Sequence, residues 1–207
     1  MKVAIMQPYF MPYIGYFQLL HAVDTFVLYD DVNYITRGYI NRNNILLNGQ
    51  AHRFTLPVQG ASQNALIKDI PLANDQRRFL QTLAHAYGKT PGFRIVNALL
   101  QQALTTPRSI TDACHEAMAL TLAHLGLERT LVRSSTLDYD RQADAAGKLV
   151  SLCQGLGADT YINSPGGRTL YQQSQFASHG VSLWFIDPAQ SPYPQGLDTF
   201  VPNLSMI

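Results

Sequence analysis

The pattern of apolar and polar positions at the start of the chain predicts a strand, a helix and a second strand. Residues 3–6 form a short apolar run that ends at Gln7 and Pro8. Apolar side chains then recur at helical spacing over residues 13–23, and residues 25–29 form another apolar run. This order is a βαβ unit, which implies parallel pairing of the two strands.

The remaining pattern predicts a hairpin, a helical section and a return to alternating strands and helices. Asn48-Gly49 separates two strand-like runs and is a strong hairpin signal. Helical periodicity follows over residues 75–87, 92–104 and 109–125. Strands are expected at 129–134, 159–162 and 181–186, with helices at 141–156 and 168–178 between them. The sequence therefore predicts an α/β fold: one domain over residues 1–207, with a mostly parallel Rossmann-like sheet and a helical subdomain inserted at about 70–127.

The charge balance narrows the classes of partner. Only 14% of the 207 residues are charged, against roughly 25% in an ordinary soluble domain, and the net charge is +1. Such a chain has no electrostatic footprint for nucleic acid and no polybasic membrane patch. No apolar run is long enough to span a bilayer, and the first apolar run is too short for a signal peptide. We expect a cytoplasmic protein without membrane insertion, and the sequence leaves homo-oligomerisation open.

Neutral polar side chains take the place of charges. The chain holds 16 Gln, 10 Asn and 11 Tyr, and six of the tyrosines lie within the first 39 residues. Tyrosine rings stack on bases or sugar rings, and amides hydrogen-bond to hydroxyls. This composition favours a pocket for a neutral, hydroxyl-rich small-molecule substrate that carries a few anionic groups.

The first candidate site is the loop between the first strand and the first helix. In open parallel sheets ligands bind beyond the carboxyl ends of the strands, and helix N-termini attract anions. The loop offers aromatic faces, hydroxyls and a glycine that would let a ligand approach the backbone: Gln7, Tyr9, Tyr13, Gly15 and Tyr16. The alternative, a proline-stiffened loop whose aromatic rings pack on neighbouring loops, is about equally favoured.

A pair of carboxylates and a cluster of donors follow the second strand. Asp30 or Asp31 would act as a general base or hold a hydroxyl or amine, and adjacent strand residues face opposite sides, so one of them is expected in the site. Next come Asn41, Arg42 and Asn43, whose amides and guanidinium group suit a planar anion. The alternatives are a capped turn at the aspartates and a solvated loop at the amides.

Two later strands also end in polar turns. Arg133, Ser134 and Ser135 close one of them, and Ser164, Gly166, Gly167 and Arg168 form a glycine-rich turn after the other. Either turn would bind a phosphate, or would simply lead into the next helix. Four polar sequences at four strand ends predict convergence on one crevice. The histidines and cysteines lack metal-ligand spacing, so no metal site is expected.

The chain resembles the WbqC-like protein family. The resemblance rests on the long motif from Met6 to Leu47 and on shorter pieces downstream: Arg133-Ser134-Ser135, the segment from Thr160 to Gly167, and Tyr193-Pro194-Gln195. It implies a role in bacterial polysaccharide and O-antigen gene clusters. The opening also resembles in layout the nucleotidyltransferases that bind ATP with a His-x-Gly-His motif, in whose place this chain has Tyr13-Ile14-Gly15-Tyr16.

Two functions follow as hypotheses. The first is a surface-polysaccharide (O-antigen type) or related biosynthetic enzyme, a transferase or ATP-dependent ligase. It would join an acyl or aminoacyl group to an amino sugar or amine, with ATP or a nucleotide sugar as the candidate cofactor or co-substrate. The second is a non-catalytic protein that binds a nucleotide sugar or small metabolite. A structural partner in a glycan assembly complex is a third reading, which would need a large exposed apolar patch.

Overall fold

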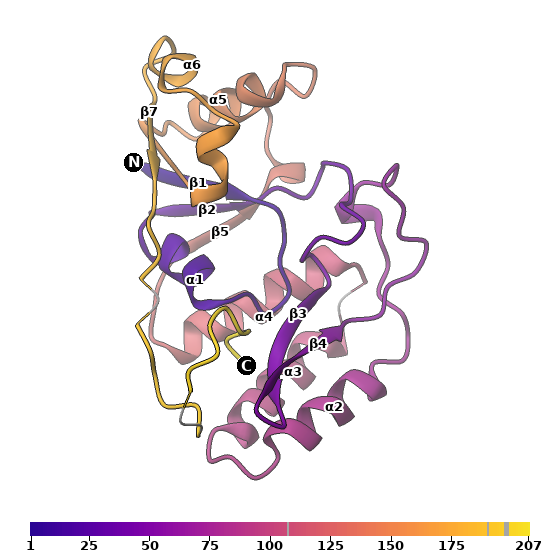
Figure 1. Ribbon diagram of the computed structural model, residues 1–207. Coiled ribbons are helices and arrows are strands. Elements are labelled where there is room, and N and C mark those ends of the chain that lie inside the picture. Colours follow the sequence, from indigo (N-terminus) through magenta and orange to yellow (C-terminus); the bar gives the residue numbers. More distant parts are fainter. Residues whose placement is uncertain (107, 190, 197–198) are drawn as a thin grey trace. The chain divides into compact units, whose positions relative to one another are not determined.

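A computed structural model of the protein describes residues 1–106, 108–189, 191–196 and 199–207 (Figure 1). The chain forms two compact units, which we call the sheet unit and the hairpin unit. The sheet unit comprises Met1–Gln7, Gly15–Asp30 and Leu127–Ala189, and the hairpin unit comprises Pro8–Ile14, Asp31–Gly126 and Gln190–Ile207. The single-domain organisation stays a prediction.

The sheet unit contains a five-stranded parallel sheet with strand order β5-β2-β1-β6-β7. Its strands are β1 (Lys2–Met6), β2 (Thr25–Leu28), β5 (Thr130–Arg133), β6 (Thr160–Asn163) and β7 (Ser182–Phe185). Short apolar runs form these strands because both faces of a parallel sheet are covered. Val3, Ala4 and Phe26 accordingly have no solvent exposure. The predicted α/β fold with a Rossmann-like parallel sheet is confirmed.

Helices cover the two faces of this sheet. Helix α1 (Ile14–His21) lies on one side, and α5 (Ala145–Gly155) and α6 (Gln173–Ala177) lie on the other (Figure 1). On the first side the Tyr16 ring packs against Phe26, with ring centroids 5.1 Å apart. On the second, Tyr161 stacks on Phe176 at 5.4 Å. The aromatic residues of the sheet unit thus fasten its helices to the sheet.

The strand order contains a topological switch point. The chain passes from β1 to its neighbour β2 and then to β5, whereas β6 and β7 lie on the opposite side of β1. Connections depart in opposite directions from β1, and the carboxyl ends of the two strands at such a switch point are where open α/β sheets bind ligands.

Two of the predicted helices differ in extent. The helix expected at 141–156 begins at Ala145, because Asp140 accepts hydrogen bonds from the backbone of Gln142 and Ala143 and Asp144 then caps the helix. The helix expected at 168–178 is two elements, the 3-10 turn η3 (Pro165–Thr169) and α6. A capping box at Gln172 starts α6 afresh, so the periodicity there spans a break.

The hairpin unit is built on the predicted β-hairpin. Strands β3 (Arg42–Leu47) and β4 (Gln50–Thr55) pair antiparallel, and Asn48 and Gly49 join them with φ values of 52° and 76°. Two successive positive φ angles are those of a type I′ turn, whose twist matches the strands. The Asn-Gly signal is therefore confirmed.

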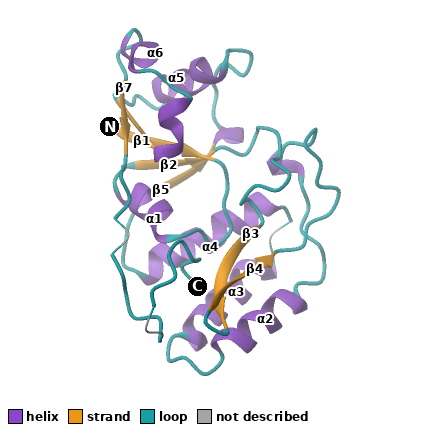
Figure 2. Cartoon of the chain, in the orientation of Figure 1, coloured by secondary structure: helices purple, strands orange, loops and turns teal. Residues whose placement is uncertain are grey.

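Three helices pack with the hairpin (Figure 2). They are α2 (Arg77–Tyr87), α3 (Phe93–Thr105) and α4 (Ile110–His124), which match the predicted helical section, and the 3-10 turn η1 (Ile67–Asp69) precedes them. Phe79 of α2 contacts Phe10 and Phe54, with ring centroids at 5.7 and 5.1 Å. Nowhere in the described ranges is a helix both long and apolar enough to cross a membrane.

Candidate functional site

The switch point of the sheet unit brings two of the predicted site sequences to neighbouring strand ends. Gln7 directly follows β1, and the turn with Ser164, Gly166 and Gly167 directly follows β6. The turn is held by its own polar groups: the Ser164 amide donates to Asn163 Oδ1 at 2.7 Å, and the Gly167 amide donates to the Ser164 carbonyl at 3.0 Å. These residues form the most compact ligand-binding candidate in the sheet unit.

Gly167 is required by close packing. A Cβ atom at this position would lie 2.3 Å from Asn163 Nδ2 and 3.2 Å from Cε1 of Phe185. The Asn163 side chain is itself buried, so it has little room to move. Glycine therefore lets the turn sit directly on the end of β6 and against the last residue of β7.

Tyr16 has a different role from the one its position suggests. Its ring is 5% exposed, and its hydroxyl donates to the Gln7 carbonyl at 2.9 Å. The side chain thereby ties the first turns of α1 to the end of β1. Gly15, also buried, lies beside it in the same helix. Tyr16 is therefore a buried residue that fixes the position of the backbone at the end of β1.

The Asp30 carboxylate accepts hydrogen bonds from the two serines that follow β5. Its Oδ1 accepts from Ser134 Oγ at 3.2 Å and from the Ser135 amide at 3.0 Å, and its Oδ2 accepts from Ser135 Oγ at 3.0 Å. The Asp30 amide in turn donates to Ser134 Oγ at 3.0 Å. Asp30 is 1% exposed and Ser134 is fully buried, so this network fastens the ends of β2 and β5 to each other.

The neighbours of this network lie closer to solvent. Arg133, the last residue of β5, is half-buried. Asp31, also half-buried, follows Asp30 directly and is the first residue of a hairpin-unit segment. The Asp30 carboxylate accepts three hydrogen bonds from Ser134 and Ser135.

In the hairpin unit the predicted amide cluster is bonded to the main chain. Asn41 accepts from the Tyr34 hydroxyl at 2.7 Å and donates to the Leu56 carbonyl at 2.9 Å. Asn43 donates to the Met11 carbonyl at 2.8 Å. Both amides are buried. The guanidinium group between them, that of Arg42, donates through Nε to the Gly38 carbonyl at 2.5 Å. These donors stabilise loops of the unit.

The loop that they stabilise contains a left-handed residue. Met11 has φ of 46° and is 6% exposed. A non-glycine residue in this region is uncommon and needs support from its surroundings. That support is a pair of donors on the Met11 carbonyl, Asn43 Nδ2 and Ser205 Oγ, the latter at 2.6 Å. The end of the chain therefore holds the aromatic loop in place.

The same loop carries a tyrosine cluster. The Tyr9 and Tyr39 rings lie 5.6 Å apart, and Tyr39 is 51% exposed. Burial raises the pKa of Tyr9 well above its usual value, and the neighbouring Tyr39 and Tyr13 raise it further. Burial likewise raises the pKa of Tyr13. These hydroxyls are neutral donors. Tyr39 was not among the predicted residues, although it extends the same N-terminal tyrosine run.

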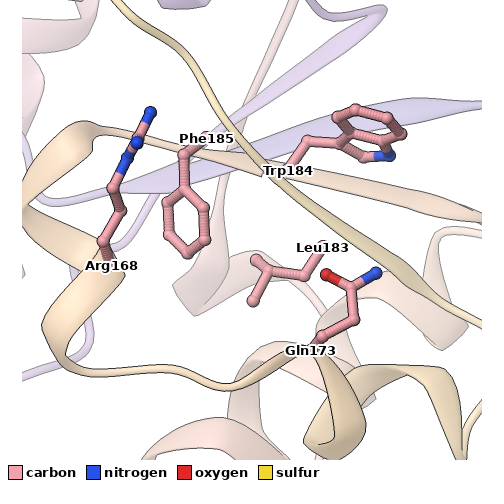
Figure 3. A pocket seen from close by; sticks show the side chains of 5 residues that line it. All are labelled: Arg168, Gln173, Leu183, Trp184 and Phe185. Carbon is pink, nitrogen blue, oxygen red and sulfur yellow. The ribbon is translucent and has the colours of Figure 1, made fainter.

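A cavity of about 270 Å³ opens at the edge of the sheet unit (Figure 3). It is lined by Arg168, Gln173, Leu183, Trp184 and Phe185. The Arg168 guanidinium lies 5.7 Å from the Phe185 ring centroid and bonds to Asp187 Oδ1 at 2.8 Å. Sequence reasoning selected Arg168 alone. Phe185 ends its strand, and the rule that ligands bind at strand ends would have found it.

The predicted residues thus divide between the two units. In the sheet unit lie Gln7, Gly15, Tyr16, Asp30, Arg133, Ser134, Ser135, Ser164, Gly166, Gly167 and Arg168, whereas Tyr9, Tyr13, Asp31, Asn41, Arg42 and Asn43 lie in the hairpin unit. Their convergence on one crevice stays a prediction. Over the part of the chain that the structure covers, no three His, Cys, Asp or Glu side chains gather as metal ligands.

Comparison with known proteins agrees with the motif. The model of the WbqC-like protein family matches residues 7–207. An uncharacterized protein of Mycobacterium tuberculosis is 27% identical over 220 residues, an alignment that covers 100% of this chain and 91% of the relative. No solved structure matches the chain.

Proposed function

Because the chain belongs to the WbqC-like protein family, we propose that it is an enzyme of bacterial surface-polysaccharide or related biosynthesis. It joins an acyl or aminoacyl group to an amino sugar or amine and uses a nucleotide-activated substrate. The family resemblance supports the polysaccharide context, and the polar strand ends of the sheet unit support a nucleotide-activated substrate.

The observation that carries the proposal is the strand order of the sheet. The order β5-β2-β1-β6-β7 has its switch point between β1 and β6, and a glycine-rich turn directly follows β6. Sheets of this topology bind nucleotides at that place because backbone amides and helix N-termini there face the phosphates. Gln7, Gly15, Ser164 and Gly166 are the residues proposed to hold the nucleotide.

The transfer step needs a base and a cationic partner for the leaving group. The amine nitrogen attacks the acyl carbonyl carbon, its proton passes to Asp31, and the activating group leaves with the bonding electron pair. Arg133, at the end of β5, is proposed to hold the anionic leaving group. Asp30 acts as a positioning residue, because its carboxylate is bonded to Ser134 and Ser135.

A second function is favoured by that same network. A protein that binds a nucleotide sugar without turnover needs the nucleotide-binding edge and no base. The more buried of the two aspartates is engaged by three donors, which leaves the catalytic reading dependent on Asp31. The two functions therefore differ at one residue.

Ligand binding is tested first by thermal unfolding. The protein is melted with ATP, coenzyme A, dTDP-sugars and UDP-sugars in turn. A ligand at 100 times its Kd stabilises the fold by about 2.7 kcal/mol, which appears as a clear rise in Tm. If no nucleotide raises Tm, both the transferase and the binding protein are rejected.

The choice between the two functions rests on Asp31→Asn. An enzyme that uses Asp31 as its base should lose turnover by about 10²- to 10⁴-fold and keep its ligand-induced rise in Tm. Asp69→Asn is the matched control, because Asp69 is an exposed carboxylate of the same unit. Equal activity in the Asp31 and Asp69 variants removes Asp31 from the mechanism.

A further inference from the structure

The cavity at the edge of β7 differs from the switch point in being lined by aromatic rings. Trp184 is 62% exposed and its indole points to one side of β7, whereas Leu183, Phe185 and the Arg168 guanidinium lie on the other side (Figure 3). A flat apolar surface and a cation on the two sides of one strand suit a ligand that crosses the strand edge, with a ring against the indole and an anion against the guanidinium. We propose that this cavity is the subsite for the nucleoside diphosphate part of the activated substrate, with the base against Trp184.

Arg168 is available to an anion because its present partner is weakly held. The Arg168 and Asp187 side chains are 50% and 82% exposed, and ion pairs of this kind contribute little to stability. The Phe185 ring nevertheless keeps the guanidinium on the cavity side. A phosphate gives the guanidinium a bidentate partner that outcompetes a solvated carboxylate. When the ligand binds, its phosphate therefore replaces Asp187 as the partner of the Arg168 guanidinium.

The backbone of β7 supplies polar groups between the two ends. Ser182 and Ile186 donate their amides to Asp159 and Asn163 on the β6 side. Side-to-side alternation along a strand places the amides of Leu183 and Phe185 on the outer edge, where β7 has no neighbouring strand among the described residues. These edge groups, with the Gln173 amide, can bond to the polar edge of a base or to ribose hydroxyls.

The cavity shares a neighbour with the turn after β6. Phe185 lines the cavity and also contacts the turn after β6, since a Cβ on Gly167 would lie 3.2 Å from its Cε1. Arg168 itself directly follows Gly167 in that turn. The inference rests on the proposed function and adds to it the place of the base.

The test uses a built-in reporter, because Trp184 is the single tryptophan of the chain. The full-length protein is titrated with UDP and with ADP while tryptophan emission is recorded under selective excitation, and Tm is measured on the same samples. Uridine and pyrophosphate probe the two ends separately. We expect saturable quenching by a nucleoside diphosphate, weaker quenching by uridine and none by pyrophosphate alone.

Substitution of the cation separates a specific contact from general charge attraction. Arg168→Gln should raise the Kd for the nucleoside diphosphate by about tenfold, the value of one charge-assisted hydrogen bond. Its effect on uridine should be small. Arg94→Gln is the matched control, since Arg94 is an exposed arginine of the hairpin unit. An equal loss in both variants overturns the assignment.

Failure of the subsite and failure of the function are distinguishable. A nucleotide that raises Tm without changing Trp184 emission binds elsewhere, which rejects the subsite and leaves the proposed function intact. Absence of both signals rejects the proposed function as well. Emission that changes with protein concentration in the absence of ligand means that a second copy covers the β7 edge, and this outcome also overturns the subsite.

Discussion

The buried polar side chains of the two units differ in what most of their hydrogen bonds join. In the sheet unit, the Asp30 carboxylate bonds to the Ser134 and Ser135 hydroxyls and so joins the ends of neighbouring strands. In the hairpin unit, Asn41 and Asn43 donate to carbonyl groups of loops, and Asn41 also accepts from the Tyr34 hydroxyl. The first arrangement holds two strand ends together, and the second supports loops. A dense run of polar residues in the sequence can therefore serve the fold itself.

The largest effect is expected from breaking the carboxylate network. Asp30→Ala removes the carboxylate that accepts three hydrogen bonds from Ser134 and Ser135 between two strand ends. We expect a loss of about 3–4 kcal/mol in the free energy of unfolding, measured by urea denaturation. Asp30→Asn should lose less than half as much, because one acceptor oxygen remains. A neutral result for alanine would mean that the network contributes nothing to the sheet.

The corresponding change in the hairpin unit should be smaller. Asn43→Ala removes the donor to the Met11 carbonyl and the acceptor for the Asn44 amide, but Ser205 still donates to Met11. We expect a loss of about 2–3 kcal/mol. Asn74→Ala, at an exposed position of the same unit, should change stability by about 0.5 kcal/mol or less. Equal losses in the two variants would contradict the buried role of Asn43.

Gly167→Ala tests the close packing at the end of β6. The new methyl group would overlap the buried Asn163 amide, 2.3 Å away. We expect a loss of about 1.5 kcal/mol, typical of overpacking, together with weaker nucleotide binding. Gly92→Ala is the control, since a Cβ there meets nothing within 4 Å. A variant as stable as the control would show that the turn can shift freely.

The smallest expected effect is on the rate of cysteine labelling, which can be compared directly between the two units. Burial raises the pKa of Cys153 in the sheet unit to about 12, and it raises the pKa of Cys114 in the hairpin unit further. A raised pKa lowers the thiolate fraction, so both thiols should resist Ellman's reagent at pH 8 until their unit opens. Asp30→Ala should speed labelling of Cys153 more than that of Cys114, and Asn43→Ala should do the reverse. Equal acceleration of both thiols would show that the units open together.

The pattern of apolar and polar residues predicted the secondary structure better than it predicted which strands pair. Apolar runs and the Asn-Gly turn located the strands to within a few residues, because burial and turn geometry act over short stretches. The pairing of β1 with β6 lies beyond such reasoning, since no local property of Val3 selects Tyr161 as its partner. Helix starts were misplaced where Asp140 and Gln172 offered their own caps.

The candidate site was predictable by position more than by chemistry. Asp30, Ser134 and Gly167 lie just beyond strand ends, as the sequence predicted, because a parallel sheet sends all of them to one edge. Sequence could not show that Asn43 and Tyr16 are buried, since burial depends on segments far along the chain. Sequence reasoning also missed Trp184. It lies in an apolar run, which predicts burial, but its strand is at the edge of the sheet and the side chain is exposed.

The central place of β1 has a consequence for synthesis and folding. Strand β1 lies between β2 and β6, and β6 begins only at Thr160. Most of the hairpin unit, residues 31–126, therefore leaves the ribosome before the sheet can close around its own first strand. Pairing over such a sequence distance is slow and leaves apolar strands uncovered meanwhile. Refolding of the sheet unit should limit the rate at which the whole chain matures.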